Sequence, residues 1–308
     1  MSKMINGKWF TEGDIATVSA TGEYQRANSV LRNWVGEARF PAEANRYHLY
    51  VADNCPWAHR TLLFRTLKQL ESVISVSTVR PRRTDQGWIF GEDPHQDDLF
   101  GFNYLHEVYR FAVTDYTGRV TVPVLFDRQS ESIVSNESSE IIRMLNHEFD
   151  EFTAVKDDYY PEALREEIDH WNERIYHTVN NGVYRAGFAA SQEAYDKAVS
   201  ELFDTLDAIE AKLETNEFLV GDRATEADWR LFPTLARFDV AYYGAFKCNL
   251  KRLTDFPNLW QYARRLYHYP GVADTVKFDI YKYGYFSPSA KRNPFGIVPK
   301  GPIVDWRL

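Results

Sequence analysis

The residue best suited to chemistry is Cys55, in the run Asn54-Cys55-Pro56-Trp57-Ala58. It follows a short apolar stretch, and Pro56 suits the first turn of a helix, where the N–H that proline lacks would have no partner. The unpaired N–H groups and the dipole of a helix start favour an anion, so a cysteine at this corner is favoured as a thiolate. We therefore predict that Cys55 is a nucleophile rather than a small core residue.

The place of a second, resolving cysteine is taken by Ala58, three residues further on. Without that thiol, a mixed disulfide at Cys55 has to be cleared by an external thiol. The other cysteine, Cys248, has no such setting and is expected to be structural. Two cysteines are too few for a disulfide framework in a chain of 308 residues, which predicts a cytoplasmic protein with reduced thiols.

Two further segments are candidates for a ligand site. Val122-Pro123 opens an apolar run, the place where thioredoxin-like domains keep a cis peptide bond beside the cysteine. Ser135-Asn136-Glu137-Ser138-Ser139 lies at a loop-to-helix junction, where N–H groups and hydroxyls bind a carboxylate and Glu137 can pair with an ammonium group. Ordinary helix capping by Ser135 or Asn136 is the alternative.

The elements that position these residues follow from hydrophobic periodicity. Strands are predicted at residues 46–52, 73–79, 122–126 and 131–134, with helices after Pro56 and near Asn136 and a loop insertion at 93–98. The order strand, helix, strand, long excursion, strand, strand, helix is that of a small α/β thioredoxin-like unit.

From Pro161 onward the pattern becomes helical, with apolar residues every three or four positions. Thr225 and Asp228 form the pattern of a capping box. We predict an N-terminal extension (1–44), a thioredoxin-like domain (45–152) and an all-α domain (160–308) that ends in an irregular tail rich in glycine and proline after Pro270.

Composition excludes several classes of protein. The net charge of −8 argues against nucleic acid and against an anionic membrane surface. No apolar stretch approaches the roughly 20 residues of a membrane span. No His/Cys spacing typical of a metal site lies near either cysteine, so no metal is expected.

Taken together, the chain resembles the glutathione transferase superfamily, and in particular its Xi class, the glutathionyl-hydroquinone reductases, over nearly its whole length. The resemblance rests on the following segments: the cysteine motif Asn54-Cys55-Pro56-Trp57-Ala58-His59-Arg60, Gly87-Trp88-Ile89-Phe90, Arg119-Val120-Thr121-Val122-Pro123-Val124-Leu125, Ser135-Asn136-Glu137-Ser138-Ser139-Glu140, Asn180-Asn181-Gly182-Val183-Tyr184-Arg185-Ala186-Gly187-Phe188-Ala189, Arg237-Phe238-Asp239 and the tail Asn293-Pro294-Phe295-Gly296 to Pro302. The class usually has His-Tyr-Tyr where this chain has Gly284-Tyr285-Phe286.

The resemblance implies the glutathione transferase architecture, with Cys55 as the nucleophile. Trp88, Arg119, Val122, Glu137 and Ser138 would hold glutathione. Tyr184, Tyr242 and Tyr285 would line a quinone pocket on the helical domain, with Tyr184 and Tyr285 taking part in catalysis. Glutathione would be a co-substrate, no cofactor would be bound permanently, and the protein would be a homodimer.

The activity implied is reduction of a glutathionylated hydroquinone through a mixed disulfide between Cys55 and glutathione. One alternative is an omega-like thioltransferase or dehydroascorbate reductase, which uses the same cysteine on smaller substrates. The other is a non-catalytic transferase-like binding module, which a reactive Cys55 disfavours.

Overall fold

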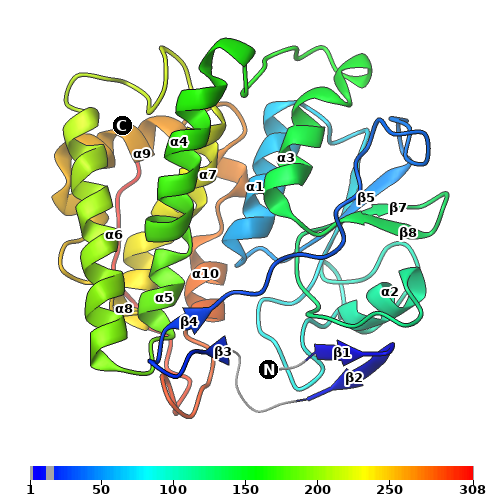
Figure 1. Cartoon of the computed structure of the whole chain (residues 1–308), viewed down its shortest axis with the longest axis horizontal. Coiled ribbons are helices and arrows are strands. Elements are labelled where there is room, and N and C mark those ends of the chain that lie inside the picture. The colour runs from blue at the N-terminus through cyan, green and yellow to red at the C-terminus, as the bar shows by residue number, and fades with distance from the viewer. Residues whose placement is uncertain (1–2, 12–16, 308) are drawn as a thin grey trace. The chain divides into compact units, whose positions relative to one another are not determined.

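The computed structural model describes residues 3–11 and 17–307, and the chain divides into two compact units (Figure 1). Unit 1 comprises residues 1–15 and 27–157, and unit 2 comprises residues 16–26 and 158–308. The segment 1–44, predicted as one N-terminal extension, is therefore divided between the units, and its residues 1–2 and 12–16 lie outside the described part.

Unit 1 is built on a four-stranded mixed sheet with the strand order β6-β5-β7-β8. The strands are β5 (Tyr47–Val51), β6 (Ser75–Thr78), β7 (Val124–Asp127) and β8 (Ser132–Ser135). β5 and β6 are parallel, whereas β7 pairs antiparallel with both of its neighbours. The predicted strands and the thioredoxin-like plan are confirmed, and the crossover from β5 to β6 runs through a helix.

Helices α1 (Pro56–Leu67) and α3 (Ser138–His147) pack side by side in unit 1 (Figure 1). Leu49 and Val51 of β5 are buried, as are Leu63, Phe64 and Leu67 of α1. Burial of such side chains, at roughly 25 cal/mol per Å² of apolar surface, is the main force that holds helices to a sheet. Unit 1 also contains η1 (Asp150–Phe152) and the hairpin strands β1 (Lys3–Ile5) and β2 (Lys8–Phe10).

The excursion between β6 and β7 contains a helix that the sequence pattern did not predict, α2 (Leu105–Ala112). The loop predicted at 93–98 is present, and it is organised by the buried Asp97. This carboxylate accepts hydrogen bonds from the Tyr50 hydroxyl (3.0 Å) and from the N–H groups of Leu99 and Phe102 (both 3.1 Å). The insertion is thereby anchored to the central strand.

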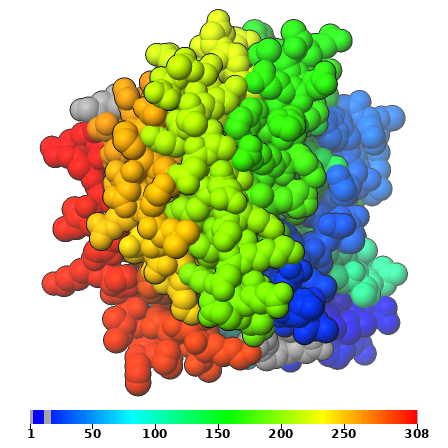
Figure 2. Space-filling view, turned by 60° about the vertical axis from the view of Figure 1, so that its left-hand side comes forward, coloured from blue at the N-terminus to red at the C-terminus, as the bar shows by residue number. Residues whose placement is uncertain are grey.

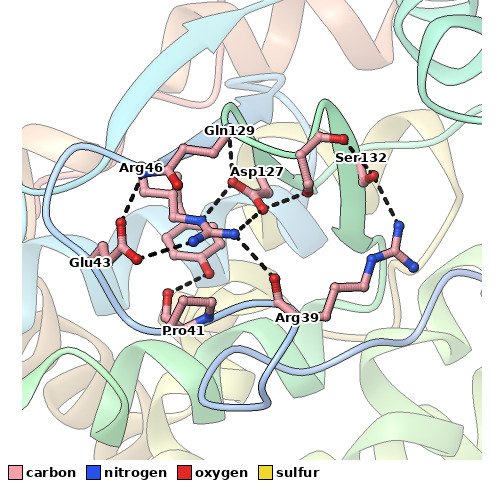
Figure 3. Close-up of polar contacts among 9 residues, drawn as sticks. Arg39, Pro41, Glu43, Arg46, Asp127, Gln129 and Ser132 are labelled. Atoms are coloured by element: carbon pink, nitrogen blue, oxygen red, sulfur yellow. Dashed lines mark hydrogen bonds and ion pairs between the residues drawn. The ribbon is translucent and has the colours of Figure 1, made fainter.

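A buried ion pair closes the end of the sheet where β5 begins and β7 ends (Figure 3). Arg46 donates to both carboxylate oxygens of Asp127 at 2.8 and 2.6 Å, and to Glu43 at 3.1 Å. Asp127 also accepts from the Gln129 N–H and the Ser130 hydroxyl. Such pairing is needed because an unpaired charge in this position would cost several kcal/mol.

Unit 2 is all-helical apart from the short strands β3 (Thr17–Val18) and β4 (Tyr24–Gln25). Its first helices are η2 (Glu162–Leu164), α4 (Arg165–Ile175), the π-helical turn η3 (Tyr176–Asn180), α5 (Gly182–Gly187), α6 (Gln192–Lys212) and α7 (Glu226–Leu235). They are followed by the π-helical turn η4 (Phe238–Tyr242), α8 (Tyr243–Ala245), η5 (Leu253–Asp255), α9 (Pro257–Tyr267), η6 (Ala273–Thr275) and α10 (Phe278–Tyr285).

The predicted capping box is present at the start of α7, where the Asp228 carboxylate accepts from the Thr225 N–H at 2.7 Å. Asp228 is fully buried and also accepts from the Tyr262 hydroxyl at 2.7 Å, so the cap ties α7 to α9. The predicted helical character of this part of the chain is confirmed.

The segment after Pro270 is less irregular than predicted, because α10 lies within it. Residues 286–307 beyond that helix are irregular, and Figure 2 shows this tail, in red, at the surface. Trp306 anchors it to α9, with ring centroids 4.8 Å from Trp260. Across residues 3–11 and 17–307, no helix is long and apolar enough to cross a membrane.

Candidate active site

Cys55 is the N-cap residue of α1, with Pro56 as the first helical residue, as predicted. Its backbone is extended and its side chain, which makes no capping hydrogen bond, is half-buried. The predicted cis peptide bond at Val122–Pro123 is present, and the Cys55 thiol points to the Val122 carbonyl oxygen at 3.7 Å. The sulfur thus lies between a helix start and the residue that precedes β7.

Cys248 lies in a different environment in unit 2. It is fully buried, and burial raises the pKa of its thiol far above the usual range. The thiol points to the carbonyl oxygens of Val183 and Phe246, each at 3.9 Å. A thiol held protonated and out of contact with solvent is a poor nucleophile.

Glu137, rather than Ser135 or Asn136, caps α3. Its carboxylate accepts from the Ser139 N–H at 3.0 Å and from the Ser139 hydroxyl at 2.9 Å. Burial raises the pKa of Glu137, but the hydrogen bonds from Ser139 and Ser29 and the charge of Arg60 outweigh it, so the pKa is lowered. Glu137 is therefore an anion at neutral pH, and capping does not exhaust its capacity to accept hydrogen bonds.

Arg60 connects the helix of Cys55 with the start of α3. This buried guanidinium lies over the Trp57 ring at 4.6 Å, and its Nη1 is 3.5 Å from the Ser138 hydroxyl. Ser138 is itself buried. Cys55 thus lies at the start of α1, and Glu137 and Ser138 lie at the start of α3. The Arg60 cation connects these two helix starts, which were predicted from separate motifs.

Tyr109 of α2 links two of the segments that were predicted to contact a ligand. Its hydroxyl donates to the Thr121 carbonyl oxygen at 2.8 Å and accepts from the Asn136 amide at 3.2 Å. The buried Asn136 Oδ1 has no hydrogen-bond partner within the described residues. The segments before β7 and α3 are therefore held together by an unpredicted helix, with one acceptor left unused.

Trp88 and Arg119 lie on two other loops of unit 1. Trp88 is only 4% exposed, yet its Nε1–H has no partner among the described residues, and Arg83 covers its ring at 4.2 Å. Arg119 is half-buried, and its carbonyl oxygen accepts from the Tyr116 hydroxyl at 2.8 Å. In the part of the chain that is described, no hydrogen bond or ring contact joins either side chain to Cys55.

The three predicted tyrosines meet in unit 2. The Tyr285 hydroxyl of α10 lies 2.6 Å from that of Tyr184 in α5 and 3.0 Å from that of Tyr242 in η4. Phe246 packs against all three rings, with centroids 5.4 to 5.5 Å apart. The Tyr285 hydroxyl thus lies within hydrogen-bond distance of both of the other hydroxyls, and each neutral phenol carries one O–H donor.

The protonation of this cluster follows from its burial. Burial, together with a neighbouring tyrosine, raises the pKa values of Tyr242 and Tyr285 well above the usual range, although Arg237 opposes the shift. Both phenols are therefore neutral hydrogen-bond donors at physiological pH. Arg237 is itself fully buried, and its guanidinium lies 3.7 Å from the centre of the Tyr281 ring.

The predicted residues are thus divided between the two units. Unit 1 holds the nucleophile and the predicted glutathione contacts, and unit 2 holds the tyrosines. Sequence reasoning gave no role to Tyr109 or Arg60; the only signal for Arg60 was its place at the end of the cysteine motif. Within the described ranges, no group of three or more His, Cys, Asp or Glu side chains is placed to hold a metal ion.

Two protein families match parts of the chain. The Glutathione S-transferase, N-terminal domain family matches residues 54–148, and the Glutathione S-transferase, C-terminal domain family matches residues 192–265.

Three relatives are similar over almost their whole length. Glutathionyl-hydroquinone reductase PcpF of Sphingobium chlorophenolicum is 49% identical over 304 residues, which cover 98% of this chain and 96% of that protein. Glutathionyl-hydroquinone reductase YqjG of Escherichia coli is 47% identical over 317 residues, covering 99% and 96%. Its glutathione-bound structure superposes with a TM-score of 0.90, at 45% identity and with 99% and 96% covered. The structure of a Xi class GST from Natrialba magadii gives a TM-score of 0.92 at 45% identity, covering 100% and 95%.

Proposed function

Because this chain belongs to the Xi class of the glutathione transferase superfamily, we propose that it reduces glutathionylated hydroquinones to hydroquinones with glutathione as co-substrate. The observation that carries the proposal is the pairing of two chemistries in one chain. A cysteine at a helix start supplies a sulfur nucleophile, and a cluster of three tyrosines, in which Tyr242 and Tyr285 are neutral phenols, supplies a proton.

Glutathione offers an ammonium group, two carboxylates and a thiol, and unit 1 offers groups that match them. In this proposal Glu137 pairs with the ammonium group, while Ser138 and the start of α3 bind a carboxylate. The unpaired Trp88 Nε1–H and the Arg119 guanidinium supply further donors. Val122 lies beside the Cys55 sulfur and would position the ligand sulfur next to it. The glutathione-bound structure of YqjG supports glutathione as the ligand of this fold.

The difficult step is release of the aromatic ring, because an aryl carbon is a poor leaving group. Addition of a proton to the ring carbon that bears sulfur gives a keto tautomer, and the hydroxyl of the ring makes this tautomer accessible. A neutral tyrosine hydroxyl can donate that proton or polarise the ring oxygen. In the cluster of Tyr184, Tyr242 and Tyr285, the Tyr285 hydroxyl lies within hydrogen-bond distance of both neighbours, which could replace a proton that it donates.

The sulfur chemistry then balances in two steps. The Cys55 thiolate attacks the glutathionyl sulfur, the carbon–sulfur bond breaks, and its electron pair passes to the ring, which leaves as hydroquinone. A second glutathione thiolate attacks the glutathionyl sulfur of the mixed disulfide, releasing Cys55 thiolate and glutathione disulfide. Overall, one glutathione thiol and the thioether sulfur of the substrate become a disulfide, while the ring carbon exchanges sulfur for hydrogen, which is a two-electron reduction of the ring.

The proposal is tested by Tyr285→Phe, because Tyr285 contacts both other hydroxyls. Loss of this proton donor should slow hydroquinone release by ~10²–10⁴-fold, the usual contribution of a general acid, unless its neighbours partly replace it. Reduction of hydroxyethyl disulfide needs no ring proton, since its leaving group is already a stable thiolate, so this second rate should be preserved. Tyr283→Phe, on the exposed face of the same helix, is the matched control.

The alternative function is that of an omega-like thioltransferase or dehydroascorbate reductase. If Tyr285→Phe leaves both rates unchanged, the tyrosines have no part in catalysis and the thioltransferase function is favoured. If it lowers both rates equally, the cluster supports packing rather than ring chemistry. The proposal retains a cytoplasmic homodimer without a permanent cofactor as the working form of the enzyme.

A further inference from the structure

The N-terminal hairpin of β1 and β2 contacts two separate loops of unit 1. Its strands pair from Lys3↔Phe10 to Ile5↔Lys8, and they turn at Asn6 and Gly7. In Figure 1 the hairpin lies next to α2. Neither loop belongs to the four-stranded sheet. One loop leads to Trp88 and the other leads to Arg119, and both of these residues are proposed to bind glutathione.

The first loop leads into Trp88. The Trp9 Nε1–H donates to the Asp85 carbonyl oxygen at 3.0 Å, and the Thr11 hydroxyl donates to the same atom at 3.1 Å. The Trp9 ring also covers Gly87, where the φ angle is +73° and an added Cβ would lie 2.8 Å from the ring. The residue directly before Trp88 is thus held against the hairpin.

Helix α2 completes the support of this loop. The His106 ring stacks on the Trp9 ring with centroids 4.7 Å apart, and its Nε2 lies 3.2 Å from the Gln86 amide oxygen. Residues 85, 86 and 87 therefore each contact either Trp9 or its stacking partner. The position of the Trp88 backbone depends on a tryptophan almost eighty residues earlier in the sequence.

The second loop leads into Arg119. Met4 and Gly118 exchange two backbone hydrogen bonds, at 2.9 and 3.0 Å. The Gly7 N–H donates to the Tyr116 carbonyl oxygen at 3.0 Å, and the Asn6 N–H donates to the Thr117 hydroxyl at 2.9 Å. The hairpin thus contacts the first loop through the Trp9 and Thr11 side chains and the second loop mainly through backbone groups.

We infer that this hairpin is a positioning element for glutathione binding, acting through Trp88 and Arg119. The inference rests on the proposed function, which makes those two residues ligand contacts. A loop that is ordered before the ligand arrives loses less conformational entropy on binding, so the affinity is higher. Loosening the hairpin should therefore weaken glutathione binding and leave the chemistry at Cys55 intact.

Two substitutions disrupt the hairpin at its two contacts. Gly7 has a φ angle of +71°, and a Cβ there would lie 2.0 Å from the Thr114 carbonyl oxygen, so Gly7→Ala displaces it from the Arg119 loop. Trp9→Leu removes the contact with the Trp88 loop. Lys8→Ala, an exposed position between them, is the matched control.

With hydroxyethyl disulfide as the second substrate, each disrupting variant should raise the KM for glutathione about ten-fold, with kcat at saturating glutathione within about two-fold of the unsubstituted protein. Alkylation of Cys55 by iodoacetamide, which needs no glutathione, should be unchanged. Trp9→Leu should add little to Trp88→Ala, because both act through one contact. Should Gly7→Ala fail to fold, Trp9→Phe, which loses the Nε1–H donor and indole ring atoms over Gly87 but keeps an aromatic ring, gives a smaller rise in KM than Trp9→Leu.

Different results overturn different claims. If Gly7→Ala and Trp9→Leu have a KM for glutathione no higher than that of Lys8→Ala, the hairpin inference is overturned. It is overturned alone if Trp88→Ala and Arg119→Ala do raise this KM. A fall in kcat and in alkylation along with the KM change means general structural damage and also overturns it. If Trp88→Ala and Arg119→Ala leave the KM unchanged, the proposed glutathione site fails, and the inference fails with it.

Discussion

The ion pair at the start of strand β5 and the polar groups beyond its other end differ in how completely they are paired, although the buried His48 Nε2 near the start also has no partner among the described residues. At the start of the strand, Arg46 and Asp127 satisfy one another and their neighbours (Figure 3). At the other end lie Cys55, the loop after β6 that carries Trp88, and the segment after β8. There, the Trp88 Nε1–H and the Asn136 Oδ1 are buried without a partner in the described structure.

This difference separates structural polar groups from binding groups. Most buried polar atoms in folded proteins have a hydrogen-bond partner, so each exception calls for an explanation. We propose that a polar ligand completes the donor and the acceptor left over at the end that carries the nucleophile. On this proposal the ion pair serves stability, and the groups at the other end bind glutathione.

The largest effect is expected at the cysteine. Cys55→Ala should abolish both hydroquinone release and reduction of hydroxyethyl disulfide, because each passes through a disulfide at this sulfur. Thermal unfolding should be little changed, since the side chain is small and half-buried. Cys248→Ala is the matched control, with a rate close to that of the unsubstituted protein; retained activity in Cys55→Ala would contradict the mechanism.

At the paired end, Arg46→Ala should lower stability without a change in ligand binding. Removing the guanidinium leaves the buried Asp127 charge unpaired, at a cost of ~3–5 kcal/mol in the free energy of unfolding. Urea unfolding measures the loss. Arg39→Ala, which removes an exposed contact with Ser132 and a contact with the Phe40 ring but leaves no charge buried and unpaired, should have a much smaller effect. A rise in the KM for glutathione as large as that of a site variant would remove the distinction between the two ends.

Glu137→Ala should weaken glutathione binding by ~1.5–3 kcal/mol, the range for a hydrogen bond to a charged group. Calorimetry measures the dissociation constant. Glu137→Gln separates the two roles of this residue, because an amide oxygen still accepts from Ser139 but carries no charge. We expect Gln to restore stability and not affinity. If Gln binds glutathione as well as the native residue does, pairing with an ammonium group is excluded.

The smallest effect is a pH dependence of stability. Burial raises the pKa of Asp127, but the Arg46 and Ser130 hydrogen bonds outweigh it, so the pKa in the folded state is lowered. A carboxylate with a lowered pKa stabilises the fold above its unfolded pKa of about 3.9, and this contribution is lost as the pH falls through the folded value. The difference in unfolding free energy between the native protein and Asp127→Asn should thus shrink below about pH 4. A difference that stays constant from pH 7 to pH 3 would contradict this account.

Features set by neighbouring residues could be predicted from the sequence. The start of α1 follows from Pro56, and the start of α7 follows from Thr225 and Asp228, because a cap is formed within four residues. Helix α2 was missed because its N-cap is Tyr104, an unusual capping residue, and only Leu105, Val108 and Tyr109 are buried in it. An apolar face of three residues is too short to indicate a helix.

Contacts between distant segments could not be predicted from local sequence patterns. The meeting of Tyr184, Tyr242 and Tyr285 was expected only from the family resemblance, since nothing in their spacing requires it. Nothing in the sequence predicted the contact of Trp9 with Asp85, because this contact depends on how a hairpin packs on a loop. Glu137 was correctly placed at a helix start, yet its role as the cap itself depends on the backbone geometry there.

The most direct test of the central claim is mass spectrometry of the protein after incubation with a glutathionyl-hydroquinone and no free glutathione. The account predicts one glutathionyl group, attached to Cys55, together with one equivalent of released hydroquinone, and removal of the adduct when glutathione is added. Release of hydroquinone from Cys55→Ala, or a glutathionyl group on Cys248 instead of Cys55, would contradict it.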